Sequence, residues 1–147
     1  MSAEENKASV RRFFEEVCNG RNLRAAEAIF DPELVYHEPL SVSPGGKGIT
    51  AIQNEVSIYH KGFPDAQWIV HEVLAAENDK VVARWTGQGT HRGELPGIPP
   101  TGQKVTVEAL TLFTCKNGKI IEMVDLWDAL SMMQQLGIVP SPGQASS

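Results

Sequence analysis

Gly-Lys-Ile-Ile-Glu-Met-Val-Asp-Leu-Trp-Asp, residues 118–128, is the stretch from which the rest of the fold can be inferred. It follows Asn117, and an Asn-Gly pair is a strong signal for a hairpin turn. We therefore predict a strand over residues 119–127. Large apolar side chains occupy both of its faces: Ile120, Val124 and Leu126 on one, Ile121, Met123 and Trp127 on the other. A strand that is apolar on both faces is covered on both, so we expect it to lie centrally in its sheet.

Two carboxylates interrupt this apolar strand. Asp125 shares the face of Met123 and Trp127, whereas Asp128 shares the face of Val124 and Leu126. A carboxylate among apolar neighbours is costly unless it is paired, hydrogen-bonded or neutralised. For this reason the end of the strand is the first place to look for function.

Asp128 also has a purely structural interpretation. Residues 129–136 are good helix formers, Gly137 stands where a helix ends and Pro140 follows, so Asp128 is the natural N-cap of a short last helix. Capping would keep Asp128 ionised and lower its pKa, the opposite of a raised general acid. The two roles can coexist, because a base needs only one free oxygen.

The composition is that of an ordinary globular protein. The chain has 147 residues, 41% of them hydrophobic, and a net charge of −5 without a basic cluster. This charge disfavours nucleic-acid or anionic-membrane binding. The first residues contain no apolar segment, and no stretch approaches a membrane span, so we expect a cytoplasmic protein. Two isolated cysteines, Cys18 and Cys115, are expected to be reduced core residues.

The order of the expected elements predicts an α+β domain over residues 1–139. Helices are expected from about Ala3 to Gly20, from Asn22 to Asp31 and from Ile49 to Gly62, and strands over 34–37, 67–76, 80–91, 103–115 and 119–127. Helices at the start and long antiparallel strands after them are typical of a strongly curved sheet. Residues 41–48 are rich in Gly and Ser and predict a lid or rim, and residues 140–147 predict a disordered tail.

Most standard catalytic motifs are missing from the sequence. It has no Gly-rich phosphate loop, no His-Glu-x-x-His and no Cys-x-x-Cys, and the pairs His37-Glu38 and His71-Glu72 are isolated. We therefore expect neither a metal nor a cofactor. This leaves acid–base chemistry carried out by the side chains themselves.

One face of the expected strand 80–91 could form the wall of a ligand pocket. It carries Trp85, Gly87, Gly89 and His91, and the two glycines leave room beside the ring. The alternative is a strand bend at the glycines with a core tryptophan and a solvated histidine. His37 is likewise compatible with either a pocket mouth or a plain surface position.

Several short motifs together resemble one family. They are Phe63-Pro64-Asp65, Asp79-Lys80-Val81-Val82-Ala83-Arg84-Trp85, Gly89-Thr90-His91-x-Gly93, Gly97-Ile-x-Pro-Thr-Gly102, Gly118-Lys-Ile-x-Glu122 and Asp128-x-x-x-x-x-Gln-Gln-Leu-Gly137. Over Val10 to Gly137 the chain resembles the SnoaL-like polyketide cyclases, or ester cyclases, of the nuclear transport factor 2-like superfamily. The resemblance implies a conical α+β barrel, with three N-terminal helices packed in a strongly curved, mostly antiparallel sheet and a pocket open at one end. It also implies a homodimer through the outer sheet face.

The resemblance also implies a site. In these cyclases an aspartate at the start of the last helix is the acid/base of an intramolecular aldol closure, and Asp128 matches that position. His91 is our first choice for the donor that stabilises the oxyanion. The family often has an aromatic residue where this chain has Val124. The residues expected to contact a small apolar or aromatic carbonyl substrate are Trp85, His37, Phe14, Tyr59 and Val124.

Two other functions are compatible with the superfamily. In an epoxide hydrolase or isomerase, Arg84, Asp125 and Asp128 would form an Asp-Arg-Asp set, although the strand alternation places the two aspartates on opposite faces. In a small-molecule binding module, Asp128 would only cap the helix. In each case the uncovered face with Met123 and Trp127 predicts a dimer interface, with Asp125 beside it.

Overall fold

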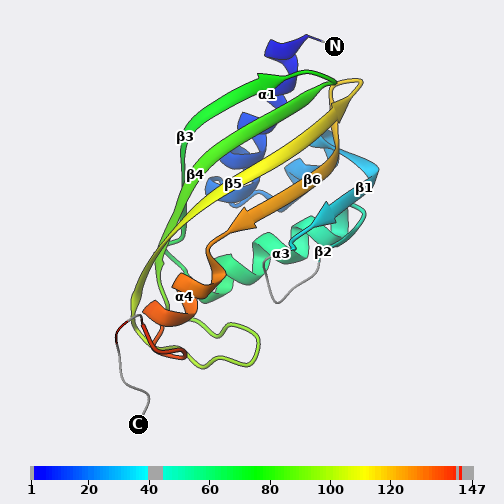
Figure 1. The fold of residues 1–147 in the computed structure, drawn as a ribbon. Coiled ribbons are helices and arrows are strands. Elements are labelled where there is room, and N and C mark those ends of the chain that lie inside the picture. The colour runs from blue at the N-terminus through cyan, green and yellow to red at the C-terminus, as the bar shows by residue number, and fades with distance from the viewer. Residues whose placement is uncertain (1, 40–44, 142, 144–147) are drawn as a thin grey trace.

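One curved sheet of six strands dominates the described part of the computed structural model, which covers residues 2–39, 45–141 and 143 (Figure 1). The strands are β1 (Phe30–His37), β2 (Gly45–Lys47), β3 (Gln67–Ala76), β4 (Lys80–Thr90), β5 (Lys104–Lys116) and β6 (Lys119–Trp127). They are ordered β2-β1-β6-β5-β4-β3, and the β1–β6 pair is parallel whereas the others are antiparallel. Within the described residues the edge strands β2 and β3 do not pair with each other, so the sheet is an open cone and not a closed barrel.

The helices lie on the concave face and at one end of the sheet (Figure 1). They are α1 (Ala3–Arg12), the π-helical segment η1 (Phe13–Asn19), the 3₁₀ turn η2 (Leu23–Ala25), α2 (Ala26–Ile29), α3 (Ile49–Gly62) and α4 (Ala129–Gln135). The first expected helix is therefore α-helical and then π-helical. The second is shorter than expected, because Pro32 disfavours helix in the residue before it and the chain is already extended at Phe30.

Strand β2 was not expected from the sequence. It consists of Gly-Gly-Lys, which carries no strand signal, and it pairs with the end of β1. Gly45 has a φ of +102°, and a Cβ at this position would lie 2.0 Å from the carbonyl oxygen of Tyr36. Only glycine allows this close approach of the two backbones. The rest of the expected lid, residues 41–44, lies outside the described residues, as do residues 142 and 144–147 of the expected tail.

The expected assignment of the two faces of β6 is wrong. Met123 and Trp127 are buried beneath the helices, whereas Leu126 is 39% exposed on the outer face. The cause is an irregularity in the β5–β6 register, where Thr114 pairs with Glu122 but Cys115 pairs with Ile120. The extra residue shifts the alternation, so counting by twos from buried Ile120 assigns every later side chain to the wrong face. Met123 and Trp127 are consequently not available to a partner.

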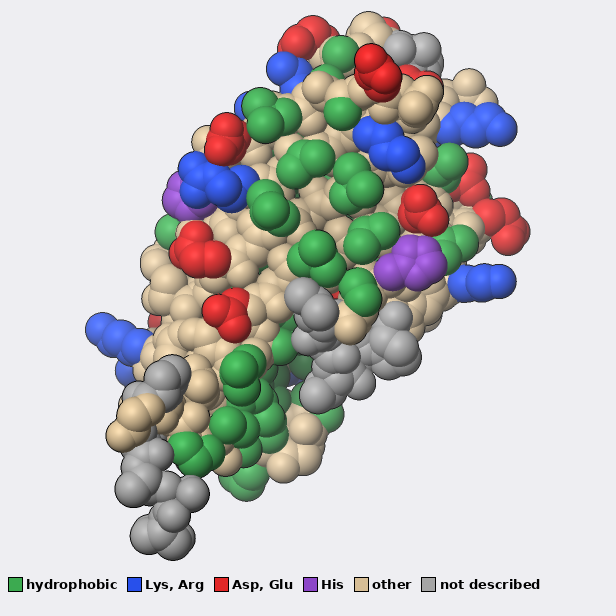
Figure 2. All heavy atoms as spheres, in the orientation of Figure 1, with side chains coloured by type: hydrophobic (Ala, Val, Ile, Leu, Met, Phe, Trp, Pro, Cys, Tyr) green, Lys and Arg blue, Asp and Glu red, His purple; other side chains and the backbone are tan. Residues whose placement is uncertain are grey.

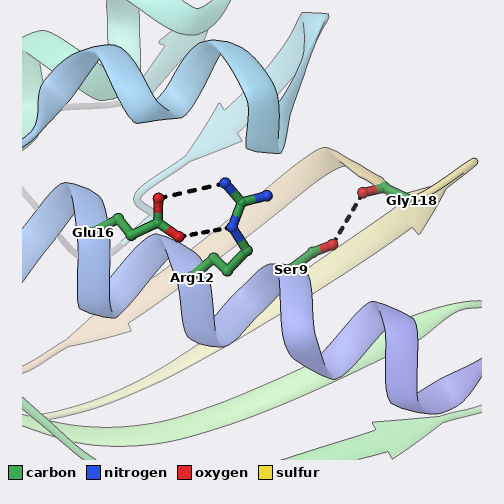
Figure 3. Close-up of polar contacts among 4 residues, drawn as sticks. All are labelled: Ser9, Arg12, Glu16 and Gly118. Carbon is green, nitrogen blue, oxygen red and sulfur yellow. Dashed lines mark hydrogen bonds and ion pairs between the residues drawn. The ribbon is translucent and has the colours of Figure 1, made fainter.

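Side-chain contacts fasten α1 and β4 to the rest of the fold. The hydroxyl of Ser9 donates a 3.0 Å hydrogen bond to the carbonyl oxygen of Gly118 at the β5–β6 turn, while Arg12 and Glu16 pair along the helix surface at 2.7 Å (Figure 3). At the far end of the sheet, the Asp65 carboxylate accepts hydrogen bonds from the backbone N–H and the hydroxyl of Thr90. The Phe-Pro-Asp motif therefore anchors the end of β4.

Both cysteines are buried and free, in agreement with the expectation from their spacing. In the described ranges, none of the helices combines the length and the apolar character needed to cross a membrane.

Candidate active site

A pocket, open to solvent on one side, lies between the concave face of the sheet and the helices η1 and α3. Most of the wall is apolar: Phe13, Phe14, Ile52, Val56, Phe63, Ala66, Trp68, Trp85, Val105, Val107, Met123, Trp127 and Met132. The polar groups are few, and the ionisable ones are Tyr36, Glu38, Glu55, Tyr59 and Asp125. An apolar enclosure around a few acidic groups is suited to proton transfer on an apolar molecule.

Asp125 occupies the pocket wall because it shares the inward face of β6 with Met123 and Trp127. Thr111, its partner across the β5–β6 ladder, donates a hydrogen bond of 2.7 Å to Asp125 Oδ1. The same hydroxyl oxygen accepts the indole N–H of Trp85 at 2.9 Å. Since the indole occupies an acceptor site on Thr111, the hydroxyl proton points to Asp125. The arrangement presents a donor to the carboxyl group from a fixed direction.

Glu38 brings a second carboxyl group to Asp125. The parallel β1–β6 register pairs Tyr36 with Met123 and His37 with Val124, so Glu38 arrives beside Asp125. The two carboxyl groups are hydrogen-bonded to each other, and the phenol of Tyr36 donates to Glu38 Oε1. Glu38 is only 2% exposed.

Helix α3 contributes Glu55 and Tyr59, which are hydrogen-bonded to each other. The Tyr59 ring meets the ring of Trp127 edge-on, with 5.8 Å between centroids. Burial, together with the nearby carboxylates, raises the pKa of Tyr59 and the pKa of Tyr36 well above the usual range of a phenol. Both phenols therefore keep their protons at neutral pH and act as hydrogen-bond donors.

The surroundings of Asp125 raise its pKa. Burial raises the pKa of Asp125 to about 6, against the lowering effect of the hydrogen bonds from Thr111 and Glu38, and the charge of Glu55 adds to the increase. A carboxyl group with a pKa near neutrality can both accept and return a proton in that pH range. This is the property expected of an acid/base residue.

Asp128 has a different environment. It is exposed, and its Oδ1 accepts the backbone N–H of Ser131 at 2.9 Å, which makes it the N-cap of α4. Asp128 does not belong to the residues that line the pocket in the described part of the chain. The structural role expected for Asp128 is therefore present, and its catalytic role stays a prediction.

His91 is buried behind the pocket wall. Its Nδ1 accepts the backbone N–H of Thr101 at 3.2 Å, and its ring packs against Phe63 with 5.5 Å between centroids. Burial lowers the pKa of His91. The side chain ties the β4–β5 connection to the end of β4, and it does not reach the described lining of the pocket. Its role as an oxyanion donor likewise stays a prediction.

The other expected substrate contacts divide into two groups. Phe14, Trp85 and Tyr59 line the pocket. His37 and Val124 point away from it, since they alternate with Tyr36 and Met123, and His37 lies 3.4 Å from Glu122 on the surface. Whether the three pocket residues bind substrate remains a prediction.

Glu38 and Glu55 were missed from the sequence, although each carried a signal. Glu38 continues the alternation of Leu34 and Tyr36, both of which are buried. Glu55 lies on the face of α3 that carries Ile52 and Val56. A carboxylate in phase with buried side chains marks a candidate functional residue.

The Asp-Arg-Asp set of an epoxide hydrolase is not brought together. Arg84 lies on the outer face of the sheet and pairs with Glu72 at 2.9 Å, whereas Asp125 faces the pocket. As for metals, the described residues contain no group of three or more His, Cys, Asp or Glu side chains that could hold an ion.

Comparisons with known proteins agree with this fold. Residues 8–136 match the family model of the SnoaL-like polyketide cyclases. The chain therefore belongs to the SnoaL-like polyketide cyclase family. No curated protein sequence matches it significantly.

Solved structures of the same architecture cover almost the whole chain. A protein from Jannaschia sp. CCS1, assigned as a SnoaL-like polyketide cyclase, is 27% identical with a TM-score of 0.82, over 93% of this chain and 94% of its own. AclR from Streptomyces galilaeus, assigned as a hydroxylase, is 26% identical with a TM-score of 0.81. The match covers 95% of this chain and 89% of AclR. IdmH from Streptomyces antibioticus, assigned as a polyketide cyclase, is 25% identical with a TM-score of 0.75. The match covers 90% of this chain and 98% of IdmH.

Proposed function

We propose that this protein is a cyclase that performs acid–base catalysis with its own side chains, on a small apolar carbonyl compound. The observation that carries the proposal is the position of Asp125, a carboxyl group with a raised pKa in the wall of an aromatic pocket. Membership in the SnoaL-like polyketide cyclase family supports the reaction class. The reaction would be an intramolecular aldol-type ring closure or a related carbon-acid reaction.

The mechanism needs one group that removes and then returns a proton. Ionised Asp125 takes the proton from the carbon next to a carbonyl, and the electron pair of the broken C–H bond forms an enolate. The enolate carbon attacks a second carbonyl of the same molecule and forms the ring C–C bond. Asp125 then returns the proton to the resulting alkoxide, so that no net proton is gained or lost.

The pocket wall favours a flat and apolar substrate. This wall contains the aromatic rings of Phe14, Tyr59 and Trp85. Burial of apolar substrate surface against them contributes about 25 cal/mol per Å² removed from water. Exclusion of water from such a wall also strengthens the electrostatic interactions at Asp125. The same burial that binds the substrate therefore makes the base stronger.

Asp128 is the competing candidate for the acid/base, because its position matches the resemblance described above. The geometry favours Asp125, since Asp128 caps α4 and stands outside the described pocket lining. A direct comparison of the two aspartates separates these assignments. Asparagine at position 128 would still cap the helix, so the Asp128→Asn variant is a matched control.

The test uses 5-nitrobenzisoxazole, a flat aromatic carbon acid that reports on any well-placed base. Removal of its C3 proton breaks the N–O bond, and the electron pair leaves on oxygen as a coloured phenolate. We expect Asp125→Asn to slow this turnover at least about 100-fold, the usual contribution of a general base. Asp128→Asn should retain the wild-type rate within about twofold. Equal rates for wild type and Asp125→Asn would overturn the proposal.

The non-catalytic alternative predicts a different pair of results. A binding module would quench the fluorescence of Trp85 or Trp127 when an aromatic ligand binds, without any turnover that depends on Asp125. The acidic groups in the pocket do not favour this alternative, because a purely apolar ligand gains nothing from buried carboxyl groups.

A further inference from the structure

We propose that Glu38 is the positioning residue for Asp125: the two carboxyl groups share one proton, and Glu38 holds it, so that Asp125 is the ionised member that acts as the base. This inference rests on the proposed function, because it specifies how the same site is prepared for catalysis. It assigns a role to a buried carboxyl group that the aldol mechanism above does not use.

The position of the two carboxyl groups, adjacent in the β1–β6 register and on the same pocket wall, favours one shared proton. Two carboxylates have only acceptor oxygens, so a hydrogen bond between Glu38 and Asp125 requires one of them to be protonated. A pair with one proton and one negative charge is the stable state of two close carboxyl groups. The question is which residue holds the proton.

The donors around the pair assign the proton to Glu38. Asp125 already accepts the hydroxyl of Thr111 at 2.7 Å, and that hydroxyl is oriented by the indole of Trp85. An additional hydrogen bond from Glu38 gives Asp125 two donors, which stabilise its charged form. The Tyr36 phenol donates to Oε1 of Glu38.

The difference in burial between the two residues also favours a protonated Glu38. Glu38 is 2% exposed, whereas Asp125 keeps a partly accessible surface in the pocket wall. A charge costs more at the more deeply buried position, so the neutral form belongs on Glu38 and the charge on Asp125. The charge is then located where a substrate can reach it.

The other titratable groups that face Asp125 are known within the described chain. They are Tyr36 from β1, Glu38 directly after β1, Glu55 and Tyr59 from α3, and Cys18 from η1. Glu55 raises the pKa of Asp125 by its charge, while the hydrogen bond from Glu38 lowers it. Glu38 therefore offsets part of the unfavourable effect of Glu55 and of burial.

Carboxyl ¹³C NMR tests the assignment without any substrate. Protein labelled at the side-chain carboxyl carbons of Asp and Glu would be titrated from pH 4 to 9, with Glu38→Gln and Asp125→Asn identifying the two resonances. We expect the Glu38 carbon at pH 7 to have the chemical shift of a neutral carboxyl group and the Asp125 carbon that of a carboxylate. An ionised Glu38 at pH 7 would overturn the proposal.

A pair of variants provides a second, independent readout. Glu38→Gln keeps an N–H donor for Asp125, whereas Glu38→Leu removes the donor and keeps the volume. The titration midpoint of Asp125 should stay within about half a pH unit in the first variant and rise by about one unit or more in the second. Equal midpoints in both variants would show that Glu38 only fills space. The NMR experiment could show a neutral Glu38 and an ionised Asp125 while the protein fails to turn over 5-nitrobenzisoxazole. That outcome would refute the proposed function and leave the assignment of the proton to Glu38 intact.

Discussion

Asp125 and Asp128 lie three residues apart, but only Asp125 faces the pocket, where it accepts a hydrogen bond from Thr111, whereas Asp128 accepts the backbone N–H of Ser131 and starts α4. The two carboxyl groups therefore have separate tasks at the end of one strand. Asp125 is held in an apolar enclosure that raises its pKa, and Asp128 supports the helix that closes the domain.

The proposed base should give a characteristic pH profile. Asp125 acts as a base only when it is ionised, and its pKa is about 6, so kcat/KM for 5-nitrobenzisoxazole should rise with pH through about 6 and level off above it. Below that midpoint the rate should fall about tenfold per pH unit. Stopped-flow or plate-reader rates between pH 4.5 and 8.5 measure the profile. A midpoint near 4 would indicate an ordinary exposed carboxylate as the base.

Because the pKa of Asp125 is raised, ionisation of this residue at neutral pH lowers the free energy of unfolding. Its folded-state pKa of about 6 lies above the ordinary value of 3.8, so its contribution to stability is fully present below pH 3.8 and is lost as pH rises through 6. This difference corresponds to at most about 3 kcal/mol at pH 7. We expect Asp125→Asn to increase the free energy of unfolding by about 1–2 kcal/mol at pH 7.5, after the lost hydrogen bonds are deducted.

Urea unfolding at two pH values checks this prediction. The advantage of Asp125→Asn should disappear near pH 4, where the wild-type carboxyl group is largely neutral in the folded protein. Asp128→Asn, which keeps a capping side chain, should stay within about 0.5 kcal/mol of wild type at both pH values. A destabilised Asp125→Asn protein at pH 7.5 would mean that hydrogen bonding outweighs burial at this site.

The hydroxyl of Thr111 is hydrogen-bonded to both Asp125 and Trp85. Removing this hydroxyl should therefore affect both residues. Without the hydroxyl of Thr111 the pKa of Asp125 should rise, because that hydrogen bond favours the charged form. Thr111→Val also leaves the buried indole N–H of Trp85 without its acceptor, at a cost of about 1–3 kcal/mol.

Trp85→Phe is the matched comparison for Thr111→Val. It removes the indole N–H but keeps the hydroxyl that donates to Asp125. The Asp125 midpoint, measured by carboxyl NMR, should therefore shift clearly in Thr111→Val and only slightly in Trp85→Phe. Equal shifts in both variants would contradict the proposed direction of the Thr111 hydroxyl proton.

Much of the fold could be predicted from local patterns. Strands β3 and β6 begin and end at the expected residues, and α3 spans the expected 49–62, because alternation and helical spacing are local signals. The face of β6 could not be predicted in this way. One irregularity in its pairing with β5 shifts the alternation, and that irregularity depends on a partner strand, not on β6 itself.

The site illustrates a second limit of local reasoning. Asp125 stands out in the sequence because it interrupts an apolar strand. Its partner Glu38 directly follows β1, a strand distant in sequence that a parallel pairing brings beside β6. No local pattern indicates that pairing. The family resemblance directed attention to Asp128, and only the burial and hydrogen bonds of the two aspartates separate a helix cap from a pocket residue.

The outer face of the sheet remains the predicted dimer interface, although its residues differ from those first expected. Leu110 and Leu126 are paired across β5 and β6 and are 48% and 39% exposed. Leu74, which is 55% exposed, begins a row of apolar side chains that continues through Val82 and Leu112. Figure 2 shows hydrophobic side chains on this face among scattered charged groups. We expect two copies to cover these leucines, since a two-fold contact is the commonest closed arrangement.

A charge placed in this surface should separate the copies. Leu110→Glu would bury an unpaired carboxylate in the interface, so sedimentation equilibrium at micromolar concentration should give a monomer for this variant and a dimer for wild type. Leu130→Glu is the matched control, because Leu130 is 60% exposed but lies on α4, away from the sheet face. Circular dichroism would verify that both variants are folded. A monomeric wild type, or dissociation by Leu130→Glu in place of Leu110→Glu, would exclude the sheet face as the contact.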